Sequence, residues 1–335
     1  MVKAWAFSLL ILGFSSALAE SPADFYKGRT LELYISTSAG GGYDSTGRIL
    51  ARHIGNHISG NPNVITRNMP GSGGVRLANF LYNAAPRTGG VIGIFNRGVA
   101  FDVLRGNKQA QFDPTKFNWI GSTSDEISLC IAWHTSGVTR WEELRNRELV
   151  VGSTGESADN FQFPTVANAI LGTKFKMITG YPGGSDLDLA LERGEIQGRC
   201  GWSWTSINST RKHWVLEKKL NILFQMALEK DPDLPNVPLI MDLASSEQDR
   251  EILRIMFARQ LMAWPFAAPP EVPEERVEVL RKAFMATMGD PAFLADASKG
   301  NFDIKPVSGL RMQQLVREVY STPDSTVERF RRILQ

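Results

Sequence analysis

Residues 31–54 read LELYISTSAGGGYDSTGRILARHI, in which three consecutive glycines separate two apolar patterns. Apolar and polar residues alternate over 31–35, as in a half-buried strand, and apolar residues recur at helical spacing over 46–58. Gly40, Gly41 and Gly42 therefore lie in a predicted strand-to-helix turn. Such a turn directs the free N–H groups of the first helical turn toward whatever lies above it, which favours an anion.

The turn does not match the two common nucleotide-binding loops. A Walker loop needs a lysine after its last glycine, and this position holds Tyr43. The dinucleotide fingerprint needs a third glycine, and this position holds Ser45. Two interpretations stay open for these residues alone: a cradle for an anion other than a nucleotide, or a flexible turn in which Asp44 or Ser45 caps the helix.

The first 19 residues have the pattern of a secretory signal peptide. Lys3 precedes an apolar run over 4–14, and Ala17-Leu18-Ala19 forms a small-x-small cleavage site. The apolar run is too short to span a bilayer. We therefore predict an exported protein, and the remaining chain is long enough for two domains.

Charge and cysteine content limit the partners that the sequence supports. Lys and Arg number 37 against 35 Asp and Glu, and the basic residues are scattered, so we predict no nucleic-acid partner. Cys130 and Cys200 are the two cysteines, and no CxxC motif is present. They form either one disulfide or two buried thiols. His53 and His57 lie four residues apart without further ligands, so we predict neither a metal site nor a cofactor.

Short apolar strands alternate with amphipathic helices from residue 31 to about residue 226. This alternation predicts an α/β fold with parallel sheets and helices on both faces, whose ligands bind beyond the carboxyl ends of the strands. Four junctions are rich in glycine and serine: TSAGGGYD (37–44), MPGSGG (69–74), GSTGESADN (152–160) and GYPGGSD (180–186). Their number predicts that several helix amino ends converge on one site from two lobes.

In this order, and together with LPNVPLI (234–240) and WPFAAPPEVPEERVEVLRKAF (264–284), these motifs resemble the Bug family, the extracytoplasmic solute receptors of tripartite tricarboxylate transporters. The resemblance covers essentially the whole mature chain. It implies a monomeric, two-lobed periplasmic binding protein of type II topology with a ligand cleft between the lobes. Lobe 1 is expected to comprise residues 24–124 and about 226–335, and lobe 2 about 125–225.

The resemblance also implies the residues that bind a ligand carboxylate. In family members the first glycine loop and the loop matching GSTGESADN face each other across the cleft. Carried onto this sequence, the implied residues are Ser38, Ala39, Gly40, Gly41, Gly42, Tyr43 and Asp44 in lobe 1, and Ser153, Thr154, Gly155, Ser157 and Asn160 in lobe 2, with Tyr181, Pro182, Gly183 and Gly184 nearby.

Three positions depart from the family pattern. Ser38-Ala39 stands where family members usually have prolines, Tyr43 where the residue is commonly small, and Trp264 where arginine is usual. Because these positions lie at or near the expected cleft, we expect them to affect which ligand binds more than the fold.

Further candidates come from the residues themselves. Asn96 and Arg97 follow a predicted strand, so Arg97 is either a contact for a second carboxylate or a surface arginine. Trp202 and Trp204 alternate at the end of another strand, so one of them faces the cleft or both pack in the core. Arg199 and Glu156 lie in the same neighbourhoods and stay open as candidates.

These features predict a periplasmic protein that captures an organic carboxylate, such as a di- or tricarboxylate or an aromatic acid. It would deliver this ligand to the membrane subunits of a tripartite tricarboxylate-type transporter without chemical change. A receptor that serves a signalling partner is one alternative. A secreted α/β hydrolase is another, although Gly201-Trp202-Ser203-Trp204-Thr205 lacks the last glycine of a nucleophile elbow.

Overall fold

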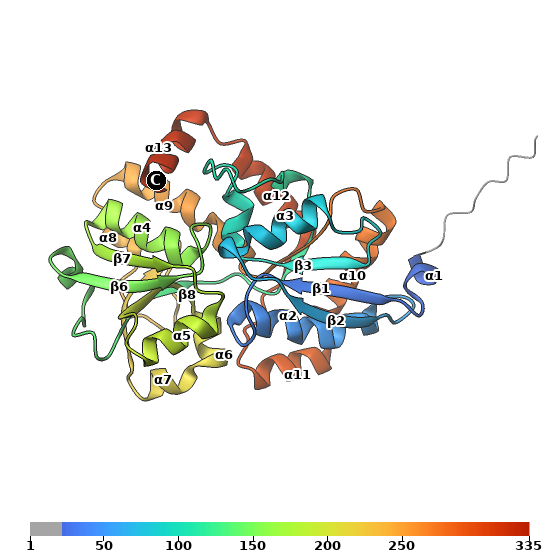
Figure 1. Ribbon diagram of the computed structural model, residues 1–335, viewed down its shortest axis with the longest axis horizontal. Coiled ribbons are helices and arrows are strands. Elements are labelled where there is room, and N and C mark those ends of the chain that lie inside the picture. The colour runs from blue at the N-terminus through green and yellow to red at the C-terminus, as the bar shows by residue number, and fades with distance from the viewer. Residues whose placement is uncertain (1–21, 335) are drawn as a thin grey trace, which may run out of the picture.

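The computed structural model describes residues 22–334, so the predicted signal peptide lies outside the described residues. The fold consists of two sheets with helices on both faces of each (Figure 1). The first sheet has the strand order β11-β4-β10-β3-β1-β2. Its strands are β1 (Thr30–Ile35), β2 (Asn63–Asn68), β3 (Val91–Ile94), β4 (Asn118–Ser122), β10 (Pro265–Ala268) and β11 (Val307–Ser308).

Two groups of helices cover the first sheet. One face packs against apolar side chains of α2 (Gly42–His53), α10 (Glu274–Met288) and α11 (Pro291–Lys299). The other face packs against α3 (Val75–Asn83) and α12 (Gly309–Tyr320). The short helix α1 (Pro22–Tyr26) lies at the far end of this half of the molecule (Figure 1).

The second sheet has the strand order β7-β6-β8-β5-β9. Its strands are β5 (Ser128–Trp133), β6 (Glu148–Ser153), β7 (Lys174–Thr179), β8 (Gly198–Ser203) and β9 (Leu220–Met226). One face packs against α4 (Asp159–Leu171), α8 (Ile240–Leu243), α9 (Glu247–Ala258) and α13 (Asp324–Leu334). The other face packs against α5 (Gly184–Glu192), α6 (Trp204–Thr210) and α7 (Lys212–Leu216).

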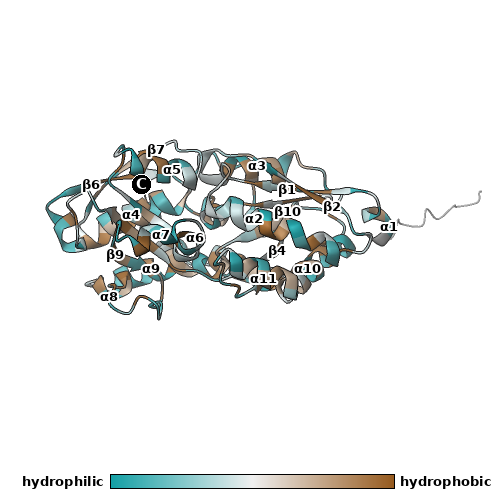
Figure 2. Ribbon diagram, turned by 90° about the horizontal axis from the view of Figure 1, so that it is seen from below, coloured by the Kyte–Doolittle hydropathy of each residue, from teal (hydrophilic) through white to brown (hydrophobic). Residues whose placement is uncertain are grey.

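Helix and strand faces follow the apolar pattern of the sequence. Figure 2 shows apolar residues concentrated on the strands and on the adjoining parts of the helices. Short 3-10 segments complete the backbone at Ile54–His57, Ser72–Gly74, Arg97–Phe101, Pro114–Lys116, Trp141–Arg145 and Arg259–Met262. Within residues 22–334, no helix is both long and apolar enough to cross a membrane.

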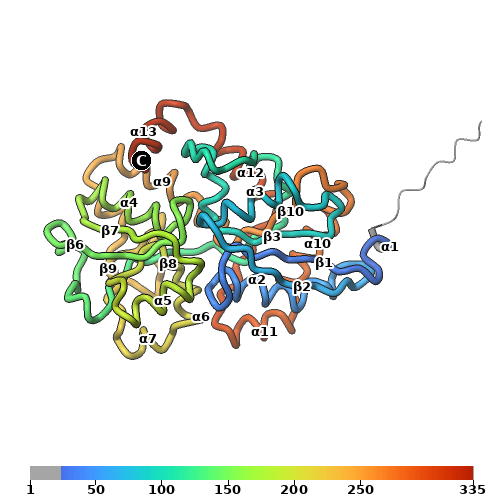
Figure 3. The backbone as a smooth tube through the Cα atoms, viewed as in Figure 1, coloured from blue at the N-terminus to red at the C-terminus, as the bar shows by residue number. Residues whose placement is uncertain are grey.

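The prediction of parallel sheets holds for part of each sheet, because both sheets are mixed. β1 runs parallel to β2 and β3, and β6 runs parallel to β7 and β8. β10, however, is antiparallel to β3 and β4, and β5 is antiparallel to β8 and β9. β5 and β10 are the first strands that the chain forms after it has crossed from one half of the molecule to the other (Figure 3). Apart from the short edge strand β11, both sheets therefore share one strand order, as expected for type II topology.

Several helices after residue 226 pack on the second sheet, which differs from the expected division of the chain into lobes. Lobe 1 was expected to contain everything after about residue 226, but buried side chains of α8, α9 and α13 pack in the core of the second sheet. Phe257 of α9 contacts Phe163 of α4 with ring centroids 5.1 Å apart, and Phe330 and Leu334 of α13 are buried in the same core. The buried side chains of these helices share one apolar core with α4 and the second sheet, and α9 and α13 lie beside α4 (Figure 3). We therefore propose lobe boundaries in which these three helices belong to lobe 2.

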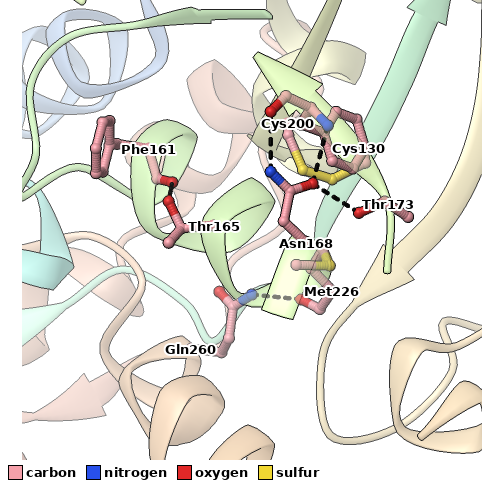
Figure 4. Close-up of a disulfide and its surroundings, with 9 residues drawn as sticks. Cys130, Phe161, Thr165, Asn168, Thr173, Cys200, Met226 and Gln260 are labelled. Atoms are coloured by element: carbon pink, nitrogen blue, oxygen red, sulfur yellow. Dashed lines mark hydrogen bonds between the residues drawn. A yellow bond between two sulfur atoms is a disulfide. The ribbon is translucent and has the colours of Figure 1, made fainter. Parts of the chain in front are cut away.

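Cys130 of β5 and Cys200 of β8 form a disulfide between adjacent antiparallel strands (Figure 4). Both cysteines are fully buried in the core beneath α4. Beside them, the Asn168 side chain donates to the backbone oxygen of Phe175 and accepts from Thr173. The cross-link therefore fixes the centre of the second sheet.

Candidate functional site

A small cavity of about 60 Å³ lies between the two halves of the molecule. Its walls come from loops that follow strands of both sheets and from the first residues of helices. The lining residues are Thr37, Gly42, Tyr43, Asn96, Arg97, Thr154, Asp159, Asn160, Gly184, Arg199, Gly201, Trp202, Ser203, Ser206, Ala263 and Trp264.

Four helices begin at this cavity. Gly42 is the first residue of α2, Asp159 and Asn160 open α4, Gly184 opens α5, and Ser206 lies in the first turn of α6. The first turn of a helix leaves backbone N–H groups without intrahelical partners and carries the positive end of the helix dipole. The arrangement therefore makes the cavity favourable for negative charge.

The side chain of Asp44 holds the first glycine loop in shape. Its carboxylate accepts hydrogen bonds from the backbone N–H of Gly40 at 2.9 Å, from Arg48 at 2.9 Å and from Asn68 at 2.8 Å. Burial raises the pKa of Asp44, but these hydrogen bonds outweigh it and lower the pKa below its ordinary value. Asp44 and Gly40 therefore stabilise the loop and do not line the cavity.

Other residues of this loop contact lobe 2. The Ser38 hydroxyl donates to the carboxylate of Asp186 at 2.5 Å, and the Ser185 hydroxyl donates to the backbone oxygen of Ala39 at 2.7 Å. A Cβ on Gly183 would collide with Ser38. A Cβ on Gly41 would lie 3.2 Å from the backbone nitrogen of Gly184. These contacts join the two halves of the molecule beside the cavity.

Aromatic side chains form one wall. Tyr43 and Trp264 meet edge to face with ring centroids 4.8 Å apart. The Tyr43 hydroxyl accepts from the backbone N–H of Arg97 at 3.2 Å and donates to the backbone oxygen of Ala263 at 3.4 Å. Burial raises the pKa of Tyr43, so its phenol stays neutral. A Cβ at Gly42 would meet Trp264 at 2.8 Å, so only glycine fits at this position.

Arg97 is paired within the protein. Its Nε donates to Asp159 at 2.5 Å and its Nη2 to Ser128 at 2.5 Å. The other carboxylate oxygen of Asp159 accepts from Arg259 at 3.2 Å. Burial lowers the pKa of Arg97, but the acidic group of Asp159 beside it raises the pKa above its ordinary value. Burial also lowers the pKa of Arg259 to about 10. The carboxylate of Asp159 is therefore shared by the guanidinium groups of Arg97 and Arg259.

Arg199 has a different environment. Its Nη1 donates to Asp188 at 2.5 Å and to the backbone oxygen of Gly184 at 3.2 Å, and its guanidinium lies 4.1 Å from the ring centroid of Trp202. Asp188 also pairs with Arg211 at 2.8 Å. Burial lowers the pKa of Arg199 below its ordinary value, although arginine stays protonated.

Three polar groups of the lining residues have no hydrogen-bond partner among residues 22–334. They are Nε of Arg199, Nε1 of Trp202 and Oγ1 of Thr37, and all three are buried. An arginine N–H and a tryptophan N–H can only donate, and a threonine hydroxyl can donate. Leaving a buried donor unpaired costs about 1–3 kcal/mol. These three donors belong to residues that line the cavity, although the donor atoms themselves are enclosed by the protein.

Comparisons with known proteins agree with this geometry. No protein-family model matches the chain. The "UPF0065 protein in gbd 5'region" of Cupriavidus necator is 25% identical over 305 residues, which cover 88% of this chain and 85% of that protein. The solved structure of the periplasmic binding protein BugD covers 92% of this chain and 98% of its own, with a TM-score of 0.74 and 19% identity. The chain has the fold of the Bug-type periplasmic binding proteins.

Two further structures with the Bug-type fold were solved with ligands. MatC of Rhodopseudomonas palustris with bound malate is 17% identical, with a TM-score of 0.70 over 92% of this chain and 99% of its own. A second R. palustris protein, solved with adipate, is 16% identical, with a TM-score of 0.70 over 91% and 96%. These comparisons confirm the resemblance that the glycine-rich motifs predicted.

The Bug-type fold brings part of the expected residue set to the cavity. The lining includes Gly42, Tyr43, Asn96, Arg97, Thr154, Asn160, Gly184 and Trp202. Asn96 caps the 3-10 segment Arg97–Phe101 by accepting from Gly98 at 2.9 Å. Asn160 accepts from the hydroxyl of Ser153 at 2.9 Å and from the backbone N–H of Thr154 at 3.1 Å, which orders the second loop.

The other expected residues lie outside the lining. The Ser157 hydroxyl accepts from Asn107 at 3.0 Å, and Gly155 packs against Gly73, so both face lobe 1 away from the cavity. Tyr181 donates its backbone N–H to Ser153 at 3.2 Å and is not a lining residue. The remaining expected residues outside the lining are Ser38, Ala39, Gly40, Gly41, Asp44, Ser153, Pro182 and Gly183.

The sequence analysis did not single out Thr37, Asp159, Gly201, Ser203, Ser206 or Ala263, which line the cavity. Thr37 and Asp159 lie within two of the quoted glycine-rich motifs, so the same motifs could have indicated them. Ser203 is the last residue of β8 and Ser206 lies three residues further on, so the carboxyl end of that strand was the available signal. No feature of the sequence indicated Ala263 as a lining residue.

The two histidines on α2 and its 3-10 extension pair with carboxylates of α11. Nε2 of His53 lies 3.1 Å from Asp296, and Nε2 of His57 lies 2.7 Å from Asp290. Across the described residues, no group of three or more His, Cys, Asp or Glu side chains is arranged to hold a metal ion.

Proposed function

We propose that this protein is a periplasmic solute-binding protein that captures an organic carboxylate in the cavity between its lobes. The observation that carries the proposal is the set of three unpaired donors, on Arg199, Trp202 and Thr37, around a cavity where four helices begin. A carboxylate supplies acceptors for these donors and the negative charge that the helix starts favour. The solved Bug-type proteins with malate and adipate hold carboxylates, which supports the same ligand class here.

Binding energy would come from few, strong contacts. A hydrogen bond that involves a charged group contributes about 1.5–3 kcal/mol, and desolvation in a closed cleft strengthens it. The contacts of Ser38 with Asp186 and of Gly73 N–H with the backbone oxygen of Thr154, at 3.0 Å, would hold the lobes together around the ligand. A ligand that contacts both lobes favours this closed arrangement over an open one.

The proposal also covers where the protein acts and which partner receives its ligand. The predicted signal peptide would export the chain to the periplasm, where it would act as a monomer. It would pass the ligand to the membrane subunits of a tripartite tricarboxylate-type transporter, without a cofactor or a chemical step. A receptor that delivers its ligand signal to a sensing partner would use the same cavity, and the identity of the membrane partner separates these two functions.

A thermal-shift screen tests the proposal. The purified chain is heated with mono-, di- and tricarboxylates, aromatic acids and neutral sugars, with sodium chloride at matched ionic strength as control. We expect at least one carboxylate to raise the midpoint of unfolding by several degrees. Stabilisation by neutral sugars alone would refute carboxylate capture.

A further inference from the structure

Three buried charged side chains meet where the two lobes touch, and we call Arg97, Asp159 and Arg259 the interlobe cluster. Arg97 opens the 3-10 segment that follows β3 in lobe 1. Its Nε donates to Asp159, the first residue of α4, and its Nη2 donates to Ser128 of β5, each at 2.5 Å. Asp159 and Ser128 belong to lobe 2, so separation of the lobes would break both contacts.

Arg259 is the lobe 2 partner of Asp159. It directly follows α9, and its Nη1 donates to the second carboxylate oxygen of Asp159 at 3.2 Å. Its Nε donates to the backbone oxygen of Met256 at 2.9 Å, which fixes it to the end of the same helix. Because α4 and α9 pack in one apolar core, the contact between Asp159 and Arg259 persists when the lobes separate. Arg97 is therefore the member that lobe 1 adds on closure.

Asp159 lies between two guanidinium groups that are buried together when the lobes are closed. The side chains of Arg97, Asp159 and Arg259 are 3%, 4% and 1% exposed. A buried ion pair adds little net stability by itself, because both groups lose water on burial, but removal of one partner leaves an unpaired buried charge and is strongly destabilising. Without the carboxylate of Asp159, closure would therefore bury Arg97 near Arg259 with no negative charge between them.

Two further acids, Glu126 and Asp102, lie near the interlobe cluster. Glu126 is close enough for its charge to act on an arginine of the cluster, but its carboxylate accepts from a backbone N–H in the first turn of α6 at 3.2 Å. Asp102 pairs with Arg105 at 2.9 Å. Burial raises the pKa of both acids above the ordinary value. Within the described residues, Asp159 is therefore the carboxylate that contacts both arginines of the cluster.

We propose that the interlobe cluster holds the lobes closed in the free protein, and that Asp159 is its essential member. The bonds of Arg97 to Asp159 and Ser128 join protein groups to one another, so they form with or without a ligand. Ligand binding then draws on a closed form that is already populated. This inference concerns closure and not the class of ligand, so its failure would leave the proposed function intact.

Small-angle X-ray scattering of the purified chain, dialysed to remove small molecules, tests the proposal. We expect the radius of gyration of the wild type to match that of the closed structure. Asp159→Asn should raise the radius, because the closed form then buries two guanidinium groups without their shared carboxylate. The double variant Arg97→Gln, Asp159→Asn should lower the radius again, since lobe 1 no longer brings an unpaired charge into the contact.

Asp188→Asn is the matched control. Asp188 is another buried carboxylate shared by two arginines, Arg199 and Arg211, but all three side chains belong to lobe 2. The substitution should lower the stability of the chain without a change in its radius of gyration. The comparison therefore separates loss of closure from general destabilisation.

A wild-type chain with the radius of an open form, or a folded Asp159→Asn chain with the wild-type radius, would overturn the proposal. If Asp159→Asn does not fold, Ser128→Ala decides the matter. This variant keeps all charges and removes the acceptor of Nη2 of Arg97, so the closed form would leave a buried donor unpaired. We expect a larger radius for Ser128→Ala as well, and the wild-type radius would contradict the role of Arg97 in closure.

Discussion

At the scale of single residues, two arginines of the cavity have different surroundings. Arg97 is paired with Asp159, which lies 62 positions later in the sequence, and Arg199 keeps an unpaired Nε. From the sequence, Arg97 was either a contact for a second carboxylate or a surface arginine, and Arg199 stayed open as a candidate. The position of Arg97 after a strand was visible in the sequence. Its pairing with Asp159 was not, since that contact depends on how the lobes meet.

Substitution of Arg199 by lysine tests the assignment. Lysine keeps the charge near Asp188 but has neither an Nε–H in that place nor a planar group to lie over Trp202. We expect carboxylate affinity to fall about tenfold to a hundredfold, which corresponds to the loss of one charged hydrogen bond. Titration calorimetry measures this change.

The matched control is Arg193→Lys, at a side chain that is 61% exposed and pairs with Glu195 at the surface. It should leave the affinity unchanged. If Arg199→Lys bound the ligand as well as wild type, Arg199 would not be the carboxylate contact.

At the scale of elements, the glycine-rich junctions were the strongest signal in the sequence. Three of the four contribute lining residues, because they precede α2, α4 and α5. The fourth, over 69–74, instead donates the Gly73 N–H to Thr154 across the lobes. Local sequence predicts where a helix begins, but it does not predict which helix starts share a cavity, since that is set by tertiary packing.

The close approach of two such junctions gives a prediction about closure. Gly41 has φ −87°, which alanine tolerates, yet its Cβ would lie 3.2 Å from the backbone nitrogen of Gly184. We therefore expect Gly41→Ala to hinder closure and to weaken ligand binding roughly tenfold, with little change in the stability of the free protein.

Gly289→Ala is the control, because a Cβ there meets its nearest atom at 3.8 Å and the backbone has φ −97°. Both variants are compared by calorimetry and by thermal unfolding without ligand. Wild-type affinity in Gly41→Ala would mean that the lobes bind ligand without this contact.

At the scale of the whole molecule, the alternation of strands and helices predicted the α/β class and the resemblance predicted the two-lobed arrangement. The antiparallel direction of β5 and β10 was not predicted, because each forms after the chain crosses between the lobes and resembles any other apolar strand in sequence. The packing of α9 and α13 on the second sheet was missed for a similar reason: their amphipathic patterns do not specify which sheet they cover.

The disulfide gives a prediction about global stability. It closes a loop with a sequence separation of 70 residues at the centre of the second sheet. The double variant Cys130→Ala, Cys200→Ala should lower the free energy of unfolding by about 2–5 kcal/mol. Ligand preference should not change, since neither cysteine lines the cavity. Urea unfolding of the oxidised wild type and the variant measures the difference, and equal midpoints would exclude a stabilising cross-link.

The central claim is that a carboxylate is bound between the lobes at Arg199. A crystal structure of the chain with the acid that gives the largest thermal shift tests it most directly. We predict that the carboxylate lies within hydrogen-bond distance of Nε of Arg199 and Nε1 of Trp202, with the lobes closed. A ligand found outside this cavity, or inside it with its carboxylate turned away from Arg199, would contradict the account.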